Sequence, residues 1–381
     1  MLKATTLIDL LLPAAIILFL MPINPVISSV PASAWVMLQL AFAPAEKRWA
    51  LWPMAFVILA TARTWWLNEM HNPASSEDIL LVVASFLAAS WVSASRWTLL
   101  LKMLLIPLPL IAINISSPAW AMNIATGRNP NPIAYLIGLI AVISICMLFD
   151  QHKNKIDYLI PFVASILSIL IIWQLKSRAG LLAMAIAIGI VKLKDEYFRG
   201  RFFKAFTITA AAGIAMLTNL KFMRPSSINN AAGIDFRSDL GRLQIQNCYI
   251  HLPLSGNNRF IYGIGFEHKD KFCKNEVIAG VLDHAHNIYI QVWANAGIIG
   301  FTGMLLFMAL LVSQWRKKDK YLNPTLSRVG LAILIFVLLQ GAFDASIIYW
   351  PVTQVFTGIL LAIPFCAADH SNNSFSKPDW G

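Results

Sequence analysis

The sequence predicts an all-α integral membrane protein that crosses the bilayer many times. Of its 381 residues, 58% are hydrophobic and only 13% are charged, and the mean hydropathy is +0.65. Apolar runs of about 17–22 residues, the length that a helix needs to cross a hydrocarbon core, recur along the whole chain. We therefore expect a single transmembrane domain over residues 1–381 rather than several soluble domains.

The apolar runs predict about twelve transmembrane helices. They fall near residues 6–23, 28–44, 49–67, 78–94, 97–114, 132–149, 157–175, 179–193, 203–219, 286–313, 327–345 and 351–368. The first run lacks a convincing small-residue cleavage site, so we interpret it as a retained helix and not a signal peptide. An even number of spans places both termini on the same side of the membrane.

The basic residues predict which side that is. The formal net charge is +11, but the lysines and arginines are spread over short loops, which argues against a nucleic-acid partner. About 17 of them lie in the loops and termini on the N-terminal side, against about four in the short loops opposite, so both termini should be cytoplasmic. In the inner membrane of a bacterium, the opposite side is the periplasm. This orientation therefore predicts one large periplasmic loop over residues 221–285.

That large loop carries more lysine and arginine than topology explains, since long loops are exempt from the positive-inside rule. An anionic substrate would account for the excess, and ordinary solvated charge is the alternative. Cys248 and Cys273 both fall in the loop, in a compartment that permits disulfides, and we predict a bond between them. Cys146 and Cys366 lie in apolar runs and should be inert.

A polar stretch at the start of the predicted helix 286–313 is the strongest candidate site. His284, Asn287, Gln291 and Asn295 are spaced three, four and four residues apart, so they form one stripe on a helix. In lipid such groups must face protein or a wet cavity. For Gln291 and Asn295 we favour interhelical hydrogen bonding. An imidazole at the membrane edge can accept a hydroxyl proton, and a merely polar helix start is the alternative.

Two arginines are further candidates. Arg178 follows Lys176 and Ser177 at the start of the predicted span 179–193, and Arg242 lies in the large loop. A guanidinium matches the fork geometry of a phosphate, whereas snorkelling of Arg178 and simple solvation of Arg242 are the alternatives. No grouping of cysteine and histidine has metal-ligand spacing, so we expect neither a metal site nor a cofactor.

Taken in order, several motifs make residues 129–304 resemble the O-antigen ligase/polymerase family of bacterial membrane glycosyltransferases. The matching motifs are Asn129-Pro130-Asn131-Pro132, Ser177-Arg178 before Leu181-Leu182, Gly241-Arg242, Pro253-Leu254, Gly263-Ile264-Gly265, and His286-Asn287 with Gln291 and Gly297-Ile298-Ile299-Gly300. Two features depart from the family pattern. Asn295 stands where relatives often carry glutamate, and the segment between Pro253 and Gly263 is longer than the usual tight turn.

The resemblance implies a GT-C-like fold and a reaction. Such enzymes move a glycan from an undecaprenyl-diphosphate donor to a hydroxyl acceptor, lipid A-core or another glycan, at the periplasmic face beside membrane lipid. The transfer inverts the sugar linkage and uses no metal or cofactor. Carried onto this chain, the catalytic residues would be His286, Arg178 and Arg242. The substrate-binding residues would be Lys176, Asn287, His284 and Arg259.

Several functions stay open at this stage. The predicted outer loop over residues 116–132 is short, and a single large outer loop favours a ligase over a polysaccharide polymerase. Protein O-glycosylation is a third choice of acceptor. A different class, a membrane carrier such as an inorganic-carbon transporter, would suit many spans with polar groups inside. The missing internal repeats and the few intramembrane charges argue against a carrier.

Overall fold

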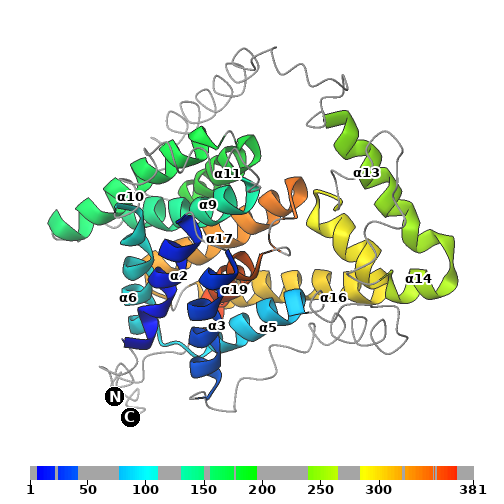
Figure 1. Ribbon diagram of the computed structural model, residues 1–381. Coiled ribbons are helices and arrows are strands. Elements are labelled where there is room, and N and C mark those ends of the chain that lie inside the picture. The colour runs from blue at the N-terminus through cyan, green and yellow to red at the C-terminus, as the bar shows by residue number, and fades with distance from the viewer. Residues whose placement is uncertain are drawn as a thin grey trace, which may run out of the picture.

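The described elements are all helices, which confirms the predicted class. A computed structural model describes residues 7–21, 25–41, 77–109, 130–149, 155–175, 177–194, 239–264, 284–319, 322–345, 347 and 350–366. The helices are α2 (Leu11–Leu20), α3 (Pro25–Ala41), α5 (Glu77–Ser90), α6 (Ala94–Leu105), α9 (Pro130–Leu148), α10 (Lys155–Gln174), α11 (Arg178–Lys194), α13 (Asp239–His251), η4 (Leu252–Ser255), α14 (Asn257–Tyr262), α16 (Ile288–Lys318), α17 (Pro324–Phe343), α19 (Pro351–Leu361) and η5 (Ile363–Phe365) (Figure 1).

The apolar runs that predicted membrane spans fold into helices wherever the structure describes them. The predicted spans 49–67 and 203–219 lie outside the described residues. Four described helices are long and apolar enough to cross a membrane: Asn131–Leu148, Asp157–Gln174, Ile288–Lys318 and Pro324–Phe343. Shorter apolar helices accompany them near the N- and C-terminal parts of the chain. The count of twelve spans stays a prediction.

Helix α9 lies at the centre of the bundle and α10 at its edge. In α9, 83% of the segment Asn131–Leu148 is buried, and the helix packs against α10, α11 and α17. In α10, only 33% of the segment Asp157–Gln174 is buried. Leu159, Phe162, Ile166 and Leu170 are exposed on α10 at a spacing of three to four residues, so they form a single apolar stripe. Such a stripe on a helix of this length is suited to contact lipid.

A buried ion pair joins the N-terminal helices to α6. The guanidinium of Arg96 donates two hydrogen bonds to the Asp9 carboxylate, at 2.8 and 2.7 Å, and Trp35 Nε1 donates a third at 2.9 Å. The Asp9 side chain is only 1% exposed. Arg96 therefore has a role in packing, because its charge neutralises a buried carboxylate.

One end of the bundle is rich in basic residues, and we call it the basic end. Lys194, at the end of α11, pairs with Asp319 just after α16, and its Nζ lies 3.4 Å from Ser327 Oγ near the start of α17. Burial alone would raise the pKa of the Asp319 carboxyl, but the hydrogen bonds from Lys194 and Ser327 and the lysine charge outweigh it and lower that pKa. The last turn of α16 adds Arg316, Lys317 and Lys318.

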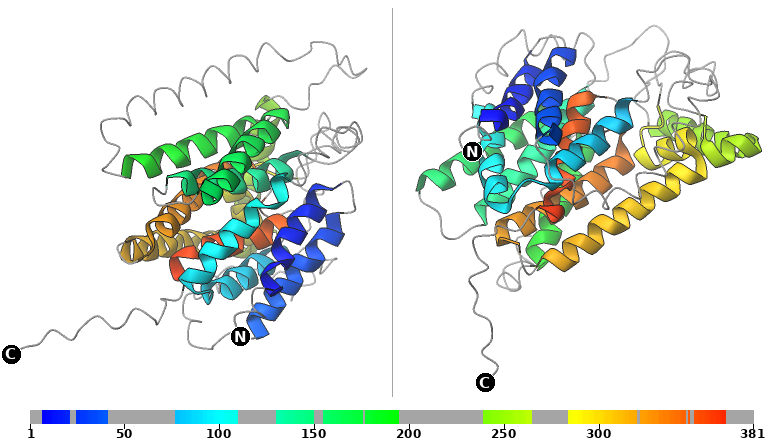
Figure 2. Two further views of the ribbon diagram at one scale, coloured as in Figure 1. Left: turned by 90° about the vertical axis from the view of Figure 1, so that its left-hand side faces the viewer. Right: turned by 90° about the horizontal axis from the view of Figure 1, so that it is seen from below.

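The described part of the predicted periplasmic loop is helical. Over residues 239–264 the chain forms α13, η4 and α14, which pack against α16. Both Figure 1 and the right panel of Figure 2 show α13 and α14 beside the first part of α16. The predicted helix 286–313 is also revised, because α16 continues to Lys318 and is kinked at Gly297, where φ is 59° and ψ is −161°. Two helical segments therefore replace the single straight span that we expected.

Candidate functional site

Asn287 begins α16 and ties it to the end of α17. Its Oδ1 accepts hydrogen bonds from the backbone N–H groups of Tyr289 and Ile290, at 2.9 and 3.2 Å, as an N-cap residue does. Its Nδ2 donates to the carbonyl of Ala342, at 3.0 Å, near the end of α17. The side chain of Asn287 therefore holds the start of α16 against the end of α17.

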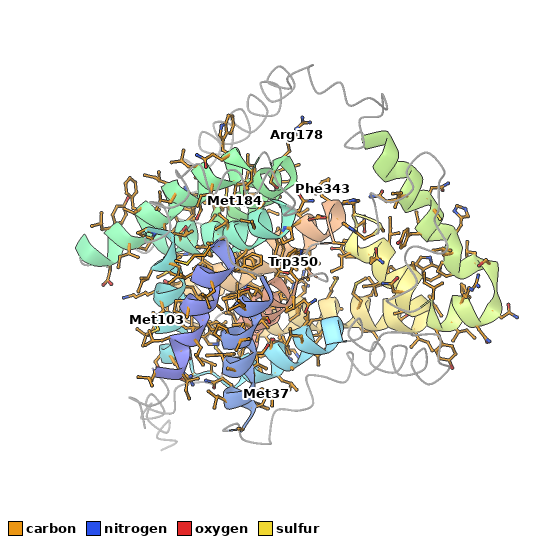
Figure 3. All side chains as sticks on the ribbon, viewed as in Figure 1. Met37, Met103, Arg178, Met184, Phe343 and Trp350 are labelled. Atoms are coloured by element: carbon orange, nitrogen blue, oxygen red, sulfur yellow. The ribbon has the colours of Figure 1, made fainter. Side chains whose placement is uncertain are left out.

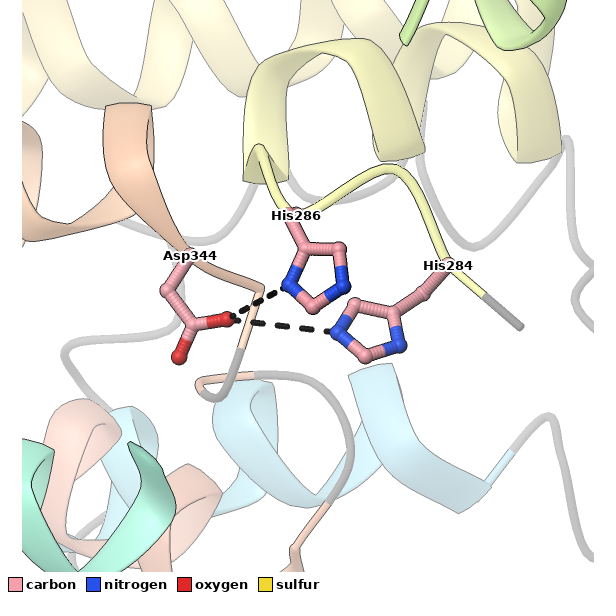
Figure 4. A group of neighbouring side chains, drawn as sticks. All are labelled: His284, His286 and Asp344. Carbon is pink, nitrogen blue, oxygen red and sulfur yellow. Dashed lines mark ion pairs between the residues drawn. The ribbon is translucent and has the colours of Figure 1, made fainter. Parts of the chain in front are cut away.

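Two histidines and an aspartate meet beside this junction. His286 Nδ1 lies 3.6 Å from Asp344 Oδ1, and His284 Nε2 lies 3.9 Å from the same oxygen (Figure 4). The centroids of the two imidazole rings are 3.9 Å apart. All three residues are buried, with 8%, 5% and 4% of His284, His286 and Asp344 exposed. We call these three residues the histidine–aspartate cluster, and the end of the bundle that carries it the histidine end.

The backbone around the cluster is held in an unusual conformation. His286 has a φ of 49°, and it is the one described non-glycine residue with a positive φ. A residue in the left-handed region costs about 1–3 kcal/mol, so it persists only where neighbouring contacts impose it. One such contact is the hydrogen bond from the Ala285 N–H to Gln291 Oε1, at 2.8 Å. Gln291 Nε2 in turn donates to Asn295 Oδ1 at 3.1 Å. Both bonds lie within residues 285–295, so the two amides form local structural hydrogen bonds at the start of α16 and not the interhelical bonds that we predicted.

Two glycines let the end of α14 cross α16 at very short range. A Cβ at Gly263 would lie 2.3 Å from the backbone of Asn295, and one at Gly297 would lie 2.6 Å from the backbone of Gly263 and Ile261. Both glycines have positive φ, at 79° and 59°. The Ile264 N–H also donates to the Ala294 carbonyl at 2.9 Å. The end of α14 at Gly263 and Ile264 therefore contacts the backbone of α16 directly beside its kink.

Arg178 lies at the histidine end. Lys194, the last residue of α11, contacts Ser327, which lies near the start of α17. Because the two helices also pack along each other, they run antiparallel. From that contact each extends about 24 Å, at 1.5 Å per residue. Arg178 therefore starts α11 at the level where Phe343 ends α17, one residue before Asp344, and Figure 3 labels both residues. Ser177, which precedes Arg178, accepts a hydrogen bond from the Gly180 N–H at 3.3 Å. Lys176 lies outside the described residues.

The remaining predicted residues belong to α13 and α14. Position 242 is on α13, on the face that carries the buried Ile245 and Tyr249, but its side chain lies outside what the structure describes. Arg259 is on α14, where Nη1 donates to Ser255 Oγ at 3.0 Å. Cys248 is disulfide-bonded, and its predicted partner, Cys273, lies outside the described residues. The structure thus brings His284, His286 and Asn287 together and leaves the distances from Arg242 and Lys176 to this group open.

Asp344 is the member of the cluster that sequence analysis missed. It lies far along the chain from His286, and only the packing of α16 against α17 brings the two together. One signal could have identified it, because a lone carboxylate at the end of an apolar run is a functional candidate by default. The three side chains together also satisfy the geometry of a small metal-ligand group, with ligand atoms within 4.8 Å of one another.

The fold and the cluster together define a multi-helix membrane protein that gathers ionisable side chains at one end of an apolar bundle. Residues 162–305 match the family described as O-Antigen ligase, which confirms the predicted O-antigen ligase/polymerase family. The match runs from α10 into α16 and includes Arg178, Arg242 and both histidines of the cluster. No curated protein matches the chain. The family and the apolar helices indicate a glycosyltransferase-like enzyme of bacterial membranes that acts on a polysaccharide or lipid-linked glycan.

Proposed function

We propose that this protein, with a GT-C-like fold, transfers a glycan from undecaprenyl diphosphate to a hydroxyl acceptor at the periplasmic face of the bacterial inner membrane. Ligation to lipid A-core is the favoured form of the reaction. The observation that carries the proposal is the pairing of His286 Nδ1 with Asp344 at 3.6 Å, in a buried cluster at the end of the bundle where α11 begins with Arg178. The family match adds the class of substrate.

His286 acts as the general base in this proposal. Asp344 faces Nδ1 and so favours the tautomer that carries its proton there, which leaves Nε2 to accept the proton of the acceptor hydroxyl. The acceptor oxygen then attacks the anomeric carbon as the bond from that carbon to the diphosphate oxygen breaks. A single displacement of this kind inverts the configuration of the sugar. Because His286 is only 5% exposed, neighbouring groups must move when the acceptor binds.

Arginines supply the second half of the reaction. The departing undecaprenyl diphosphate gains negative charge as the glycosidic bond breaks, and guanidinium groups at Arg178 and Arg242 would bind and stabilise that charge. With this stabilisation the transfer needs no metal. Lys176 and Arg259 would add cationic contacts to the donor, and His284 would contact the acceptor. Asn287 is already engaged by three hydrogen bonds, which supports a positioning role for it within the binding site.

The orientation follows from the charge at the two ends of the bundle. The basic end, with Lys192, Lys194 and the last turn of α16, is proposed to face the cytoplasm together with both termini. The histidine end then faces the periplasm, where the donor glycan is presented. Helices α13 and α14 lie on this same side in the proposal.

Replacement of His286 by alanine tests the function directly. Removal of a general base lowers the rate by about 10²–10⁴-fold, so the His286→Ala strain should lose nearly all transferred glycan. His251→Ala is the matched control, because His251 is exposed at the end of α13 and its Nδ1 lies 2.8 Å from the Asn247 carbonyl oxygen, outside the cluster. The measurement is an electrophoretic profile of surface glycan, together with the lipid-linked intermediates extracted from the membrane.

The pattern of accumulated glycan separates the reactions. A ligase defect leaves long polymer on the lipid carrier and unattached to the surface lipid. A polymerase defect instead leaves surface lipid that carries a single repeat, and loss of glycan from protein indicates protein O-glycosylation. Unchanged glycan in the His286→Ala strain, with altered uptake of a solute such as bicarbonate, would overturn the transferase proposal.

A further inference from the structure

The histidine–aspartate cluster presents three potential metal ligands to one point. We propose that His284 Nε2, His286 Nδ1 and Asp344 Oδ1 bind one Zn²⁺ ion, and that this ion inhibits glycan transfer. The binding half of the proposal stands on the geometry alone. The inhibitory half rests on the proposed function, in which His286 must be unligated to accept a proton.

The spacing of the three atoms is close to that of a tetrahedral zinc site. Zinc binds imidazole nitrogen and carboxylate oxygen at about 2.0–2.2 Å, which places neighbouring ligand atoms roughly 3.3–3.5 Å apart. The two histidine nitrogens lie 3.6 and 3.9 Å from Asp344 Oδ1, and the three atoms are all within 4.8 Å of one another. Small shifts of the side chains therefore suffice to complete three positions of the tetrahedron.

The two segments that carry these ligands are already fastened together. The hydrogen bond from Asn287 Nδ2 to the Ala342 carbonyl joins the residue next to His286 with a residue two before Asp344. The bond from the Ala285 N–H to Gln291 holds the residue between the two histidines. A site whose ligands are held in this way loses little conformational freedom when the ion binds, so that binding is favoured.

The ligand set also selects the kind of ion. Two imidazoles with one carboxylate suit Zn²⁺ and its neighbours in the first transition row, whereas Mg²⁺ and Ca²⁺ favour shells of oxygen ligands. The Asp344 carboxylate offsets part of the charge of the ion in this buried place. Coordination would occupy His286 Nδ1 and the Asp344 oxygen that orients it. The proton-accepting pair would then be lost, and transfer would stop.

Titration of Zn²⁺ into the full-length protein tests the binding half. The protein is purified in detergent, stripped of metal with a chelator, and titrated against a fluorescent zinc indicator. We expect one tight site in the native chain. In His284→Ala and Asp344→Asn we expect affinity about 100-fold weaker or worse, because the loss of even an outer-shell partner costs 10–100-fold. His251→Ala should bind like the native chain, since His251 lies outside the cluster.

A transfer assay on the same preparations tests the inhibitory half. Zn²⁺ should inhibit the native enzyme, and EDTA should restore its activity in full. Absence of tight binding in the native chain, or equal binding in His284→Ala, would overturn the site and leave the role of His286 as base untouched. If Asp344→Asn does not fold, His284→Ala still decides the matter. Activation by Zn²⁺ would overturn the inhibitory role and the metal-independent mechanism together.

Discussion

At the scale of single residues, the position of His286 depends on its neighbours on both sides. Ala285 is anchored by Gln291, and Asn287 caps α16 while it holds α17. Between these anchors the backbone of His286 takes its left-handed conformation, with φ at 49°. Strained backbone of this kind is concentrated at functional sites, where the surrounding structure imposes it. In this conformation the His286 ring places Nδ1 3.6 Å from Asp344 Oδ1.

Replacement of Asp344 by asparagine should slow transfer without weakening substrate binding. Asp344 orients His286 and does not contact substrate in the proposed mechanism, so its effect belongs to the catalytic step. We expect the 3.6 Å separation of His286 Nδ1 and Asp344 Oδ1 to shorten to a hydrogen bond in the reacting complex. A hydrogen bond to a charged group contributes about 1.5–3 kcal/mol, which corresponds to a loss of roughly 10- to 150-fold in kcat. Steady-state kinetics with a lipid-linked donor should therefore show a lower kcat and little change in KM.

Asp157→Asn provides the matched control for this prediction. Asp157 also forms an ion pair, with Lys102 at 2.7 Å, but that pair is half-exposed and lies at the start of α10. Its loss should leave kcat near the native value. An Asp344→Asn enzyme that keeps native kcat, or one that loses only affinity for the donor, would contradict the positioning role.

At the scale of elements, the kink at Gly297 divides α16 into two parts with different surroundings. The kink separates the first part of α16, which carries Gln291 and Asn295, from the long apolar part that follows. The first part packs against α13 and η4 through a small apolar cluster that includes Ile245, Tyr249 and Ala294. Gln291 and Asn295 are 0% and 1% exposed in this part of the helix, so they face protein and not lipid.

Alanine at Gly297 or Gly263 should destabilise the folded protein. Each new Cβ would meet backbone atoms at 2.6 Å or closer, and each glycine has a positive φ. Left-handed strain costs about 1–3 kcal/mol, and the clash with backbone adds to it, so we expect a total loss of about 2 kcal/mol or more. Denaturant unfolding of the purified protein in detergent micelles measures this difference.

Gly256 offers the control for the glycine variants. Nothing lies within 4 Å of a Cβ built at Gly256, and its φ of 176° is extended backbone that any residue adopts. Gly256→Ala should therefore unfold at the same denaturant concentration as the native chain. If Gly297→Ala and Gly256→Ala were equally stable, the close crossing of α14 over α16 would not be an essential contact.

At the scale of the whole molecule, the bundle has two chemically different ends. Helices α9, α11, α16 and α19 begin at the histidine end, and α17 returns to it. The lysines at the basic end pack over aromatic rings, with Lys192 4.4 Å from the ring centroid of Phe149 and Lys194 4.4 Å from that of Trp315. This separation of charge is what a membrane protein of fixed orientation requires.

Labelling of single cysteines tests the proposed orientation. Asn258 and Lys317 are both exposed, the first on α14 and the second in the last turn of α16. A membrane-impermeant maleimide added to intact spheroplasts should label Asn258→Cys and leave Lys317→Cys unlabelled until the membrane is permeabilised. The native chain serves as the control, because Cys146 and Cys366 are buried. The opposite labelling pattern would show that the histidine end faces the cytoplasm.

The amino-acid sequence alone predicted the helical class, the membrane setting and the resemblance to the O-antigen ligase family. These follow from local patterns, because apolar runs must form helices in lipid, where no water satisfies the backbone. The motifs at Arg178 and His286 and the glycines at 263 and 297 are also readable along the chain.

The packing of the helices, in contrast, establishes which residues meet. The choice of Asp344 as the partner of His286 depends on the packing of α17 against α16, a contact between segments distant in sequence. The burial of Asp9 against Arg96 has the same origin. Helix periodicity predicts which face a residue occupies, but it carries no information about which helix lies opposite, since many pairings bury similar apolar surface. For this reason the histidines could be predicted from the sequence, and the carboxylate that completes their cluster could not.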